Sequence, residues 1–287
     1  MTAGSYAKPA IPLACVLGDP ITHSLSPRLH EAALADSGIV GRYLAFQTGV
    51  AGLAETLRSL SALGFRGCNL TAPLKVAARS LLHEEDSEVR RIGAVNTIVF
   101  AEGSLIGYNT DARGLLTALR TVAGFEPGGK RILILGSGGA ARAAVSAMTD
   151  AGALRVYLSS RSRDRAQGLI DSFDDVGIEV CQRTDGLLVD LVINATTVGM
   201  RGGGNEGEAP IALANLGRCD LVYDMVYRPT LTPLLMAAKQ LGVSAFDGRS
   251  MLAAQARFAF EHFFGVLPSL DSFMKVLAVE DEDEDGG

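Results

Sequence analysis

The chain has few cysteines, and the four that it contains, Cys15, Cys68, Cys181 and Cys219, form no CxxC pair. Such wide spacing argues against a zinc site or a disulfide framework, so we expect no metal and a reducing compartment, most simply the cytoplasm. The sequence also lacks an apolar run of the ~18–20 residues that a membrane helix needs, so we expect no membrane partner. The first twenty residues carry one lysine and a short apolar stretch, and we expect no signal peptide there.

Excess positive charge is absent as well. The 287 residues include 26 lysines and arginines against 32 aspartates and glutamates, a formal charge of −6. Six acidic residues form the run 280–285, and the remainder of the chain is neutral. A protein built to hold nucleic acid needs a net basic body, so we expect no nucleic-acid partner. We expect residues 280–287 to form a disordered acidic tail, because like charges repel and nothing there can be buried.

Short apolar runs alternate with segments of helical periodicity, which is typical of α/β proteins with parallel sheets. The length suggests about two domains. We expect strands at 13–18, 42–48 and 65–71 and a hairpin within 95–109 in the first part, strands at 131–136, 154–160, 178–182, 191–196 and 221–226 in the second, and closing helices at 251–264 and around 269–279.

A glycine-rich turn follows the apolar strand 131–136 and precedes a segment of helical periodicity. Gly136 permits a tight turn, Gly138 lets the backbone approach a pyrophosphate, and Ala141 allows close packing of the helix on the strand. The N-terminus of the helix would offer free N–H groups to the phosphates. Strand, glycines and helix in this order favour a dinucleotide-binding site over an ordinary tight turn.

The end of the next strand distinguishes NADP from NAD. An NAD site carries a carboxylate there for the ribose 2′-hydroxyl. This chain instead has Ser160 followed by Arg161, Arg163 and Arg165. A guanidinium group can donate two hydrogen bonds to a 2′-phosphate, so the arginines favour NADP; the alternative is a solvated basic helix face.

Two polar clusters in the first part are candidates for a substrate site. They are residues 23–27, His-Ser-Leu-Ser-Pro, and residues 69–75, Asn-Leu-Thr-Ala-Pro-Leu-Lys. Both lie where a strand ends and a helix begins, the usual ligand edge of an open α/β sheet. Ser26 and Thr71 could equally be helix N-caps, with Pro27 as the first helical residue after Ser26.

Asp111 lies in the first turn of a helix that we expect to begin near Thr110. It could simply complement the helix dipole. Alternatively, a lysine–aspartate pair could move a proton to or from the oxygen during hydride transfer between a carbonyl and an alcohol, the carboxylate orienting the ammonium. Lys75 is the candidate partner, and its own alternative is a solvated surface lysine. Spacing does not show whether the two side chains meet.

Together these motifs resemble those of the shikimate dehydrogenase family. The matching segments occur in the family's order and cover roughly residues 13–265. They are HSLSP (23–27), GCNLTAPLK (67–75), GAVNT (93–97), GYNTD (107–111), GSGGAA (136–141), INATTVGM (193–200), YDMVYRPTLTPLL (223–235) and MLAAQA (251–256).

The resemblance implies an oxidoreductase that reversibly reduces 3-dehydroshikimate to shikimate with NADPH in aromatic amino-acid (chorismate) biosynthesis. It implies an open, mostly parallel sheet in a substrate-binding domain of residues 1–112 and 246–279, and a Rossmann-like, doubly wound NADP domain of residues 113–245, with a cleft between them. The partner it implies is a small-molecule substrate, and we expect a monomer or homodimer.

The resemblance also assigns roles to individual residues. Lys75 and Asp111 would form the catalytic pair, and both would contact the substrate. The other implied substrate ligands are Ser24, Ser26, Asn69, Thr71, Asn96, Tyr227 and Gln255. The implied cofactor ligands are Gly136, Ser137, Gly138, Gly139 and Ala140 at the pyrophosphate, Ser160, Arg161 and Arg165 at the adenosine phosphate, and Met225 and Gly248 beside the nicotinamide.

Four residues depart from the family's pattern. Ser137 stands where alanine is usual and Ser160 where asparagine is common, while Arg249 and Ser250 replace less polar residues. Alternatives to the implied activity are an enzyme acting on quinate or aminoshikimate and a non-catalytic NADP-binding regulator on the same fold. The arginines argue against the former, because catabolic quinate enzymes generally prefer NAD, and the intact Lys75 and Asp111 argue against the latter.

Overall fold

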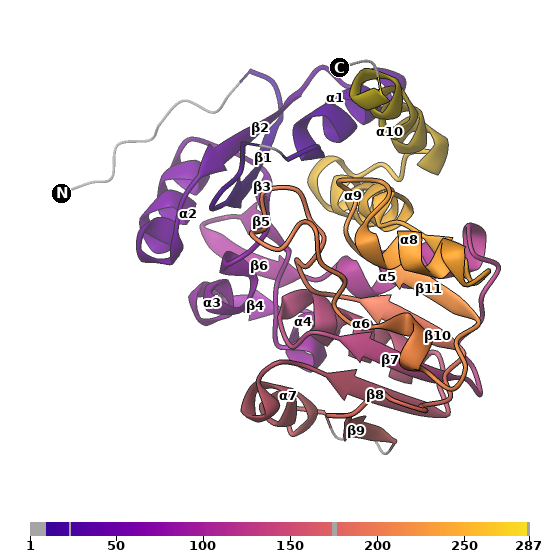
Figure 1. The fold of residues 1–287 in the computed structure, drawn as a ribbon. Helices are drawn as coiled ribbons and strands as arrows, with labels where there is room; N and C mark the ends of the chain where they lie inside the picture. Colours follow the sequence, from indigo (N-terminus) through magenta and orange to yellow (C-terminus); the bar gives the residue numbers. More distant parts are fainter. Residues whose placement is uncertain (1–9, 23, 174–176, 286–287) are drawn as a thin grey trace. The chain divides into compact units, whose positions relative to one another are not determined.

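The computed structural model describes residues 10–22, 24–173 and 177–285, with side chains to residue 278 (Figure 1). The chain divides into two compact units. One comprises Met1–Thr110 and Ala253–Gly287, and the other comprises Asp111–Leu252. The sequence predicts divisions after residue 112 and before residue 246; in the structure the second division falls inside helix α9 (Arg249–Phe264).

The first unit contains a six-stranded sheet in the order β2-β1-β3-β5-β6-β4. Its apolar strand β1 lies inside the sheet, next to the edge strand β2, and pairs in parallel with β2 and β3. The predicted hairpin is confirmed as β5 and β6, which run antiparallel, and β5 also runs antiparallel to β3. The strands are β1 (Leu13–Gly18), β2 (Arg42–Gln47), β3 (Gly67–Leu70), β4 (Glu84–Glu85), β5 (Thr97–Ala101) and β6 (Ser104–Tyr108).

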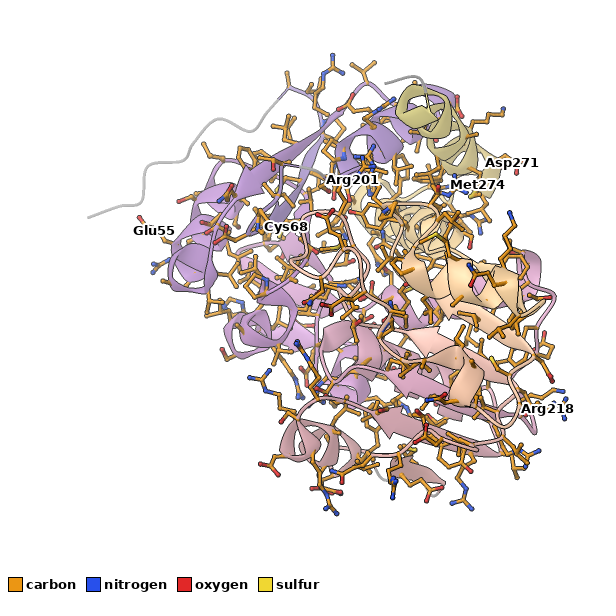
Figure 2. All side chains as sticks on the ribbon, in the orientation of Figure 1. Glu55, Cys68, Arg201, Arg218, Asp271 and Met274 are labelled. Atoms are coloured by element: carbon orange, nitrogen blue, oxygen red, sulfur yellow. The ribbon has the colours of Figure 1, made fainter. Side chains whose placement is uncertain are left out.

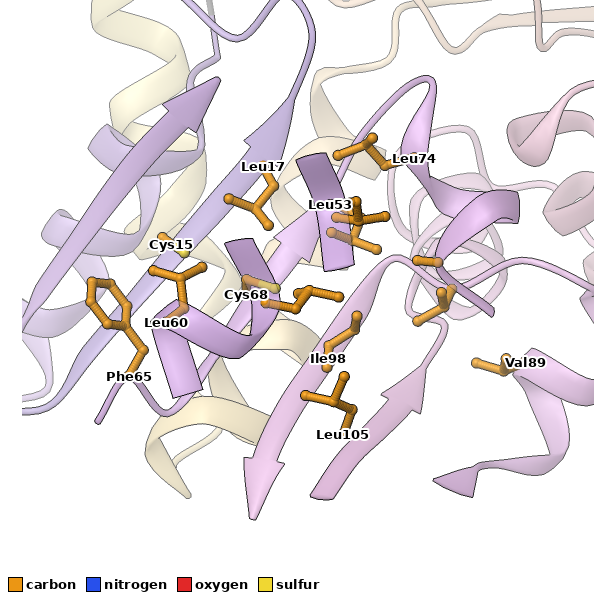
Figure 3. Packing of buried hydrophobic residues seen from close by; sticks show 14 residues of the cluster. Cys15, Leu17, Leu53, Leu60, Phe65, Cys68, Leu74, Val89, Ile98 and Leu105 are labelled. Carbon is orange, nitrogen blue, oxygen red and sulfur yellow. The ribbon is translucent and has the colours of Figure 1, made fainter. Parts of the chain in front are cut away.

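Residues from this sheet and from the neighbouring helix α2 build a continuous apolar core (Figure 3). Cys15 and Cys68 lie opposite each other on β1 and β3, and both are fully buried. Cys68 therefore lies within the unit, whereas Glu55 on α2 projects outward (Figure 2). The helices of this unit are α1 (Ser26–Asp36), η1 (Val50–Gly52), α2 (Leu53–Ala62), α3 (Leu74–Ala77), η2 (Ala78–Leu81), α4 (Ser87–Ile92), most of α9, and α10 (Leu270–Asp285).

The second unit contains a six-stranded, entirely parallel sheet in the order β12-β11-β10-β7-β8-β9. Numbered from the first strand of the unit, this order is 6-5-4-1-2-3, that of doubly wound dinucleotide-binding folds. The predicted fold class is confirmed. The strands are β7 (Arg131–Leu135), β8 (Arg155–Ser159), β9 (Ile178–Val180), β10 (Leu191–Asn194), β11 (Leu221–Asp224) and β12 (Ser244–Phe246).

The strand order of the second unit also places its ligand edge. The chain reverses direction across the sheet between β7 and β10, and such switch points are where open α/β sheets bind ligands. Both strands are buried along nearly their whole length, as the unbroken apolar runs predict. The helices are α5 (Asp111–Thr121), α6 (Gly139–Asp150), α7 (Arg163–Ile170), η3 (Leu213–Asn215) and α8 (Pro233–Gln240).

The acidic C-terminal run differs from its prediction. The sequence predicts disorder from residue 280, but the backbone is helical as far as Asp285, at the end of α10. This helix begins at Leu270 and contacts α1. Adding residues to an existing helix costs much less than nucleating one, which accounts for the continuation through like charges.

No helix in the described part of the chain is long and apolar enough to cross a membrane.

Candidate active site

Ser26 and Thr71, the two hydroxyl residues expected at the substrate edge, are not helix caps. Helix α1 begins at Ser26 itself, after Leu25 in helical conformation, so the prediction of Ser26 as the N-cap is wrong. Ser24 Oγ instead accepts from the Ser26 N–H at 3.3 Å. Helix α3 has Pro73 as its N-cap and no side-chain cap. Neither hydroxyl forms a hydrogen bond with a described residue, so both are available to a ligand. His23, which belongs to the same predicted cluster, lies outside the described residues.

Thr71 is held in place by its methyl group. It follows β3, and its backbone N–H donates to the Leu17 carbonyl at 2.9 Å. A Cβ atom added to Gly18 would lie only 2.3 Å from Thr71 Cγ2, so Gly18 is the residue that leaves room for this side chain at the end of β1. Because the methyl is packed, the direction of the Thr71 hydroxyl is restricted.

Lys75 and Asp111 are both anchored by secondary structure. Lys75 lies half-buried on α3, and its carbonyl accepts from the Val95 N–H at 2.8 Å, which ties α3 to the segment before β5. Asp111 is the first residue of α5 and is 4% exposed, an unusual burial for a carboxylate in a first helical turn. That Lys75 and Asp111 act as a pair stays a prediction.

The two predicted asparagines, Asn69 and Asn96, belong to one buried hydrogen-bond network. Asn69 Nδ2 donates both of its hydrogens within the protein, to the Asn96 carbonyl at 3.1 Å and to Thr97 Oγ1 at 2.9 Å. Asn69 Oδ1 accepts from Tyr43 Oη at 2.6 Å. Asn96 Oδ1 accepts from Thr97 Oγ1 and the Thr110 N–H, and Asn96 Nδ2 donates to Thr110 Oγ1, each at 2.9 Å.

Tyr43, Thr97 and Thr110 in this network were not predicted from the sequence as site residues. A buried tyrosine needs a partner for its hydroxyl, which is the signal that Tyr43 offers. The sequence cannot identify that partner, because Asn69 is 26 residues away and is brought beside Tyr43 only by the order of the strands.

The glycine-rich turn has the geometry of a phosphate cradle. Gly136 has φ +117°, and a Cβ there would lie 3.0 Å from the Ala195 carbonyl oxygen, so glycine is required. Gly138 is the N-cap of α6, no side chain caps this helix, and a Cβ at Gly138 would meet only open space. Gly139 and Ala140, which open the helix, therefore present N–H groups that an anion can accept from. The residues fit a dinucleotide pyrophosphate.

The arginines predicted to bind the 2′-phosphate follow β8. Arg161 and Arg165 are exposed, and among the described residues neither makes an ion pair or side-chain hydrogen bond. Ser160 Oγ lies 3.0 Å from Ser137 Oγ, which joins the end of β8 to the glycine-rich turn. Ser162 caps α7 by accepting from the Arg165 N–H. The two guanidinium groups can therefore bind an anion without breaking an existing ion pair.

Met225 and Gly248 lie against each other in the second unit. A Cβ on Gly248 would be 2.3 Å from the Met225 carbonyl oxygen, and the Gly248 N–H donates to the Val226 carbonyl at 3.0 Å. Only glycine permits this approach. The remaining two predicted residues, Tyr227 and Gln255, are half-buried. Tyr227 follows β11, and its burial raises the pKa of its hydroxyl. Gln255 lies on α9.

Comparison with known proteins identifies the family. Residues 16–98 match the model of the shikimate dehydrogenase substrate binding domain. A shikimate dehydrogenase (NADP(+)) from Geobacter sp. strain M21 is 43% identical over 92% of this chain and 93% of its own length. The chain belongs to the shikimate dehydrogenase family.

Solved structures support the same assignment and show its breadth. Shikimate 5-dehydrogenase from Thermus thermophilus, in complex with NADP(H) and shikimate, is 36% identical with a TM-score of 0.85, covering 93% of this chain and 99% of that one. The 5-ketofructose reductase of Gluconobacter sp. strain CHM43 is 30% identical with a TM-score of 0.81, covering 93% and 98%. The fold thus also carries a ketone reductase named for another substrate.

Two departures from the shikimate dehydrogenase pattern form local contacts in the second unit. Arg249 pairs with Asp247, with Nη2 2.8 Å from Oδ2, and its N–H and Nε also donate to Asp247. Ser250 Oγ lies 2.9 Å from Tyr223 Oη, which also accepts from the Met251 N–H. Both contacts hold residues 247–251, the segment that contains Gly248, in one conformation.

A second buried network supports the shikimate dehydrogenase motifs at the ends of β10 and β11. Asp224 accepts from Asn194 Nδ2 at 2.9 Å, from the Val226 N–H at 3.0 Å and from Thr232 Oγ1 at 2.7 Å. The Met225 N–H donates to the Asn194 carbonyl at 2.9 Å. Burial is the main cause that raises the pKa of Asp224 to about 6, and these hydrogen bonds partly offset it.

Asp224→Asn should change the pH dependence of stability. The native state holds a proton on Asp224 up to about pH 6, whereas the unfolded chain releases it near ~3.9. Asp224 therefore favours the folded state most below the unfolded pKa, and this contribution is lost as pH rises from about 4 to 6. Asparagine can retain the network by donating to Thr232 Oγ1. In urea unfolding, the stability of the variant relative to wild type should rise by about 2–3 kcal/mol between pH 4 and pH 7. A difference that does not vary with pH would contradict the prediction.

Proposed function

We propose that this protein reversibly reduces 3-dehydroshikimate to shikimate with NADPH. The observation that carries the proposal concerns Ser26 and Thr71, in the part of the chain that matches the substrate-binding domain. Their hydroxyls cap no helix and form no hydrogen bond with a described residue. A polyhydroxylated ring needs short neutral donors and acceptors, and a hydroxyl with no partner in the protein can use its O–H and both lone pairs for such a ligand. The whole-length similarity to NADP-dependent shikimate dehydrogenases supports the same substrate.

The second unit holds the cofactor in this proposal. The open N-terminus of α6 binds the pyrophosphate through residues 136–140, and Arg161 and Arg165 bind the 2′-phosphate, with Ser160 beside them. Met225 and Gly248 border the nicotinamide. Bound NADPH supplies the hydride that the substrate carbonyl carbon receives. The close packing of Gly248 on Met225 gives this border a fixed backbone.

In this proposal the substrate is held, and the proton moved, by residues of the first unit together with Asp111 and Tyr227 of the second. Ser24, Ser26, Thr71, Asn96, Tyr227 and Gln255 bind its hydroxyls and carboxylate. The Lys75 ammonium donates a proton to the carbonyl oxygen as the carbonyl is reduced, and receives it back when shikimate is oxidised. Asp111 accepts a hydrogen bond from the substrate hydroxyl and orients the Lys75 ammonium.

The proposal extends to the organisation of the protein. Residues 1–112 and 246–279 form the substrate-binding part and residues 113–245 the NADP-binding part. The enzyme works in the cytoplasm as a monomer or homodimer, on a small molecule and without nucleic-acid or membrane partners.

A steady-state assay that crosses two cofactors with three ketones tests the proposed function. NADPH and NADH would each be combined with 3-dehydroshikimate, 3-dehydroquinate and 5-ketofructose. We expect NADPH with 3-dehydroshikimate to give a kcat/KM at least about tenfold above every other pair, because each missing or misplaced polar contact leaves a buried group unpaired. Faster turnover of 3-dehydroquinate or 5-ketofructose would show that the proposed substrate is wrong. No turnover of any ketone would indicate a non-catalytic NADP-binding protein.

A further inference from the structure

An unbroken chain of buried hydrogen bonds runs from Tyr43 on β2 to Thr110, which lies between β6 and α5. Tyr43 Oη donates to Asn69 Oδ1 at 2.6 Å, the shortest side-chain contact in the chain of bonds. Asn69 donates to Asn96 and Thr97, and Asn96 both accepts from and donates to Thr110. All five residues are buried, between 0% and 7% exposed, so water does not compete for these bonds.

The Tyr43 ring has no freedom to turn its hydroxyl elsewhere. It stacks on His30 with ring centroids 4.0 Å apart and planes 4° from parallel. His30 itself packs among Phe260, Phe263 and Phe273. Burial lowers the pKa of His30 to about 3, so this imidazole is neutral and behaves as one more ring of the aromatic cluster. The stack therefore holds the ring in the position from which the Tyr43 hydroxyl donates to Asn69.

The chain of bonds joins the three segments that carry the proposed substrate and proton chemistry. Asn69 precedes Thr71 and Lys75, and the Leu70 N–H also donates to the Asn96 carbonyl at 2.8 Å. Asn96 is itself a proposed substrate ligand. Thr110 directly precedes Asp111 in the chain. A shift of Asn69 would be transmitted to Asn96 and Thr97, because both amide hydrogens of Asn69 are donated to these two residues. It would reach Thr110 through the hydrogen bonds of Asn96.

We propose that Tyr43 is a positioning residue for the active site, which acts through Asn69 to hold Asn96 and Thr110 in their working geometry. This inference rests on the proposed function for its kinetic readout. It assigns Asn69 to the support of the site and leaves its side chain no amide hydrogen for the substrate. Removing the Tyr43 hydroxyl would leave Asn69 Oδ1 buried without this donor, and the amide would reorient to recover a partner.

Tyr43→Phe tests the proposal, because it removes one oxygen and keeps the ring stack. With shikimate and NADP⁺, we expect KM for shikimate to rise about five- to tenfold and kcat to fall about tenfold, since small displacements of positioned groups are costly. KM for NADP⁺ should stay within about twofold. A loss of folded protein alone would lower the apparent kcat but could not raise KM. The double variant Tyr43→Phe/Asn69→Ala should be no worse than Asn69→Ala, because the two residues act in series.

Matched variants separate the hydroxyl from its surroundings. His30→Phe keeps a ring against Tyr43 and leaves the Tyr43–Asn69 bond intact, so its KM and kcat should stay within about twofold of wild type. Thr97→Val removes the hydroxyl that joins Asn69 to Asn96 and nearly keeps the side-chain volume, so it should raise KM for shikimate as Tyr43→Phe does. This variant replaces Tyr43→Phe in the test if Tyr43→Phe folds poorly. Tyr43→Phe with wild-type KM and kcat would overturn the proposal, as would strictly additive effects in the double variant.

Hydrogen exchange gives a readout that does not depend on the substrate. The Thr110 N–H donates to Asn96 Oδ1, and its exchange should be about tenfold faster in Tyr43→Phe while remaining unchanged in His30→Phe. If wild-type protein fails to oxidise shikimate, the proposed function is wrong, yet faster exchange in Tyr43→Phe would still support the positioning role. Unchanged Thr110 exchange would overturn it whatever the substrate.

Discussion

Replacing Lys75 by alanine is expected to lower kcat for 3-dehydroshikimate reduction by about 10²–10⁴-fold, the usual worth of a positioned proton donor. The KM values for both substrates should change much less, because the proton moves only in the transition state. Asp111→Asn should fall in the same range, since the amide keeps the shape of the side chain and loses its charge. The measurement is steady-state kinetics with each substrate varied in turn.

The controls for this prediction use a lysine outside the site. Lys239 is exposed on α8, and Lys239→Ala should leave kcat within about twofold of wild type, as surface substitutions usually do. The double variant Lys75→Ala/Asp111→Asn should lose little more than the worse single variant if the two residues act as a unit. A near-normal kcat for Lys75→Ala would remove this residue from the mechanism, and multiplicative losses would show that the two act independently.

Removing the Arg161 and Arg165 guanidinium groups together should raise KM for NADPH by about 10–100-fold. A hydrogen bond to a charged group is worth about 1.5–3 kcal/mol, and exposure of both arginines reduces this figure. KM for NADH and both kcat values should stay within about threefold, because NADH lacks the 2′-phosphate. The double variant Arg161→Ala/Arg165→Ala should therefore lose most of its preference for NADPH in the cofactor-crossed assay.

Arg163 provides the matched control for the arginine prediction. It is exposed and lies between the other two in the sequence, but it has no proposed contact with the 2′-phosphate. Arg163→Ala should change KM for NADPH by less than about threefold. In wild type, KM for NADPH should rise more steeply with ionic strength than KM for NADH, since salt screens exposed charges. An equal loss in all three arginine variants would indicate a general electrostatic attraction and contradict specific binding of the phosphate.

Much of the fold follows from local sequence. The unbroken apolar run of β7, the glycines after it and the helical period of α6 identify a dinucleotide-binding unit, because each depends only on neighbouring residues. The edge strands β4 and β12 have two and three residues without a detectable period, and neither was predicted from the sequence. The backbone of α10 continues through the acidic run to Asp285, which charge repulsion considered without the preceding helix does not predict.

The sequence alone determined which chemistry this protein can carry: the spacing of its glycines, the arginines after β8, and the positions of Lys75 and Asp111 along the chain. Only the tertiary structure decided which polar side chains form hydrogen bonds within the protein and which can bind a ligand. Ser26 could have been a cap and Asn69 a ligand, but the sheet brings the Tyr43 hydroxyl to Asn69, and α1 begins at Ser26 itself with Leu25 as its N-cap. The reason is that a hydrogen bond between residues 26 positions apart depends on strand order and register, which local periodicity does not specify.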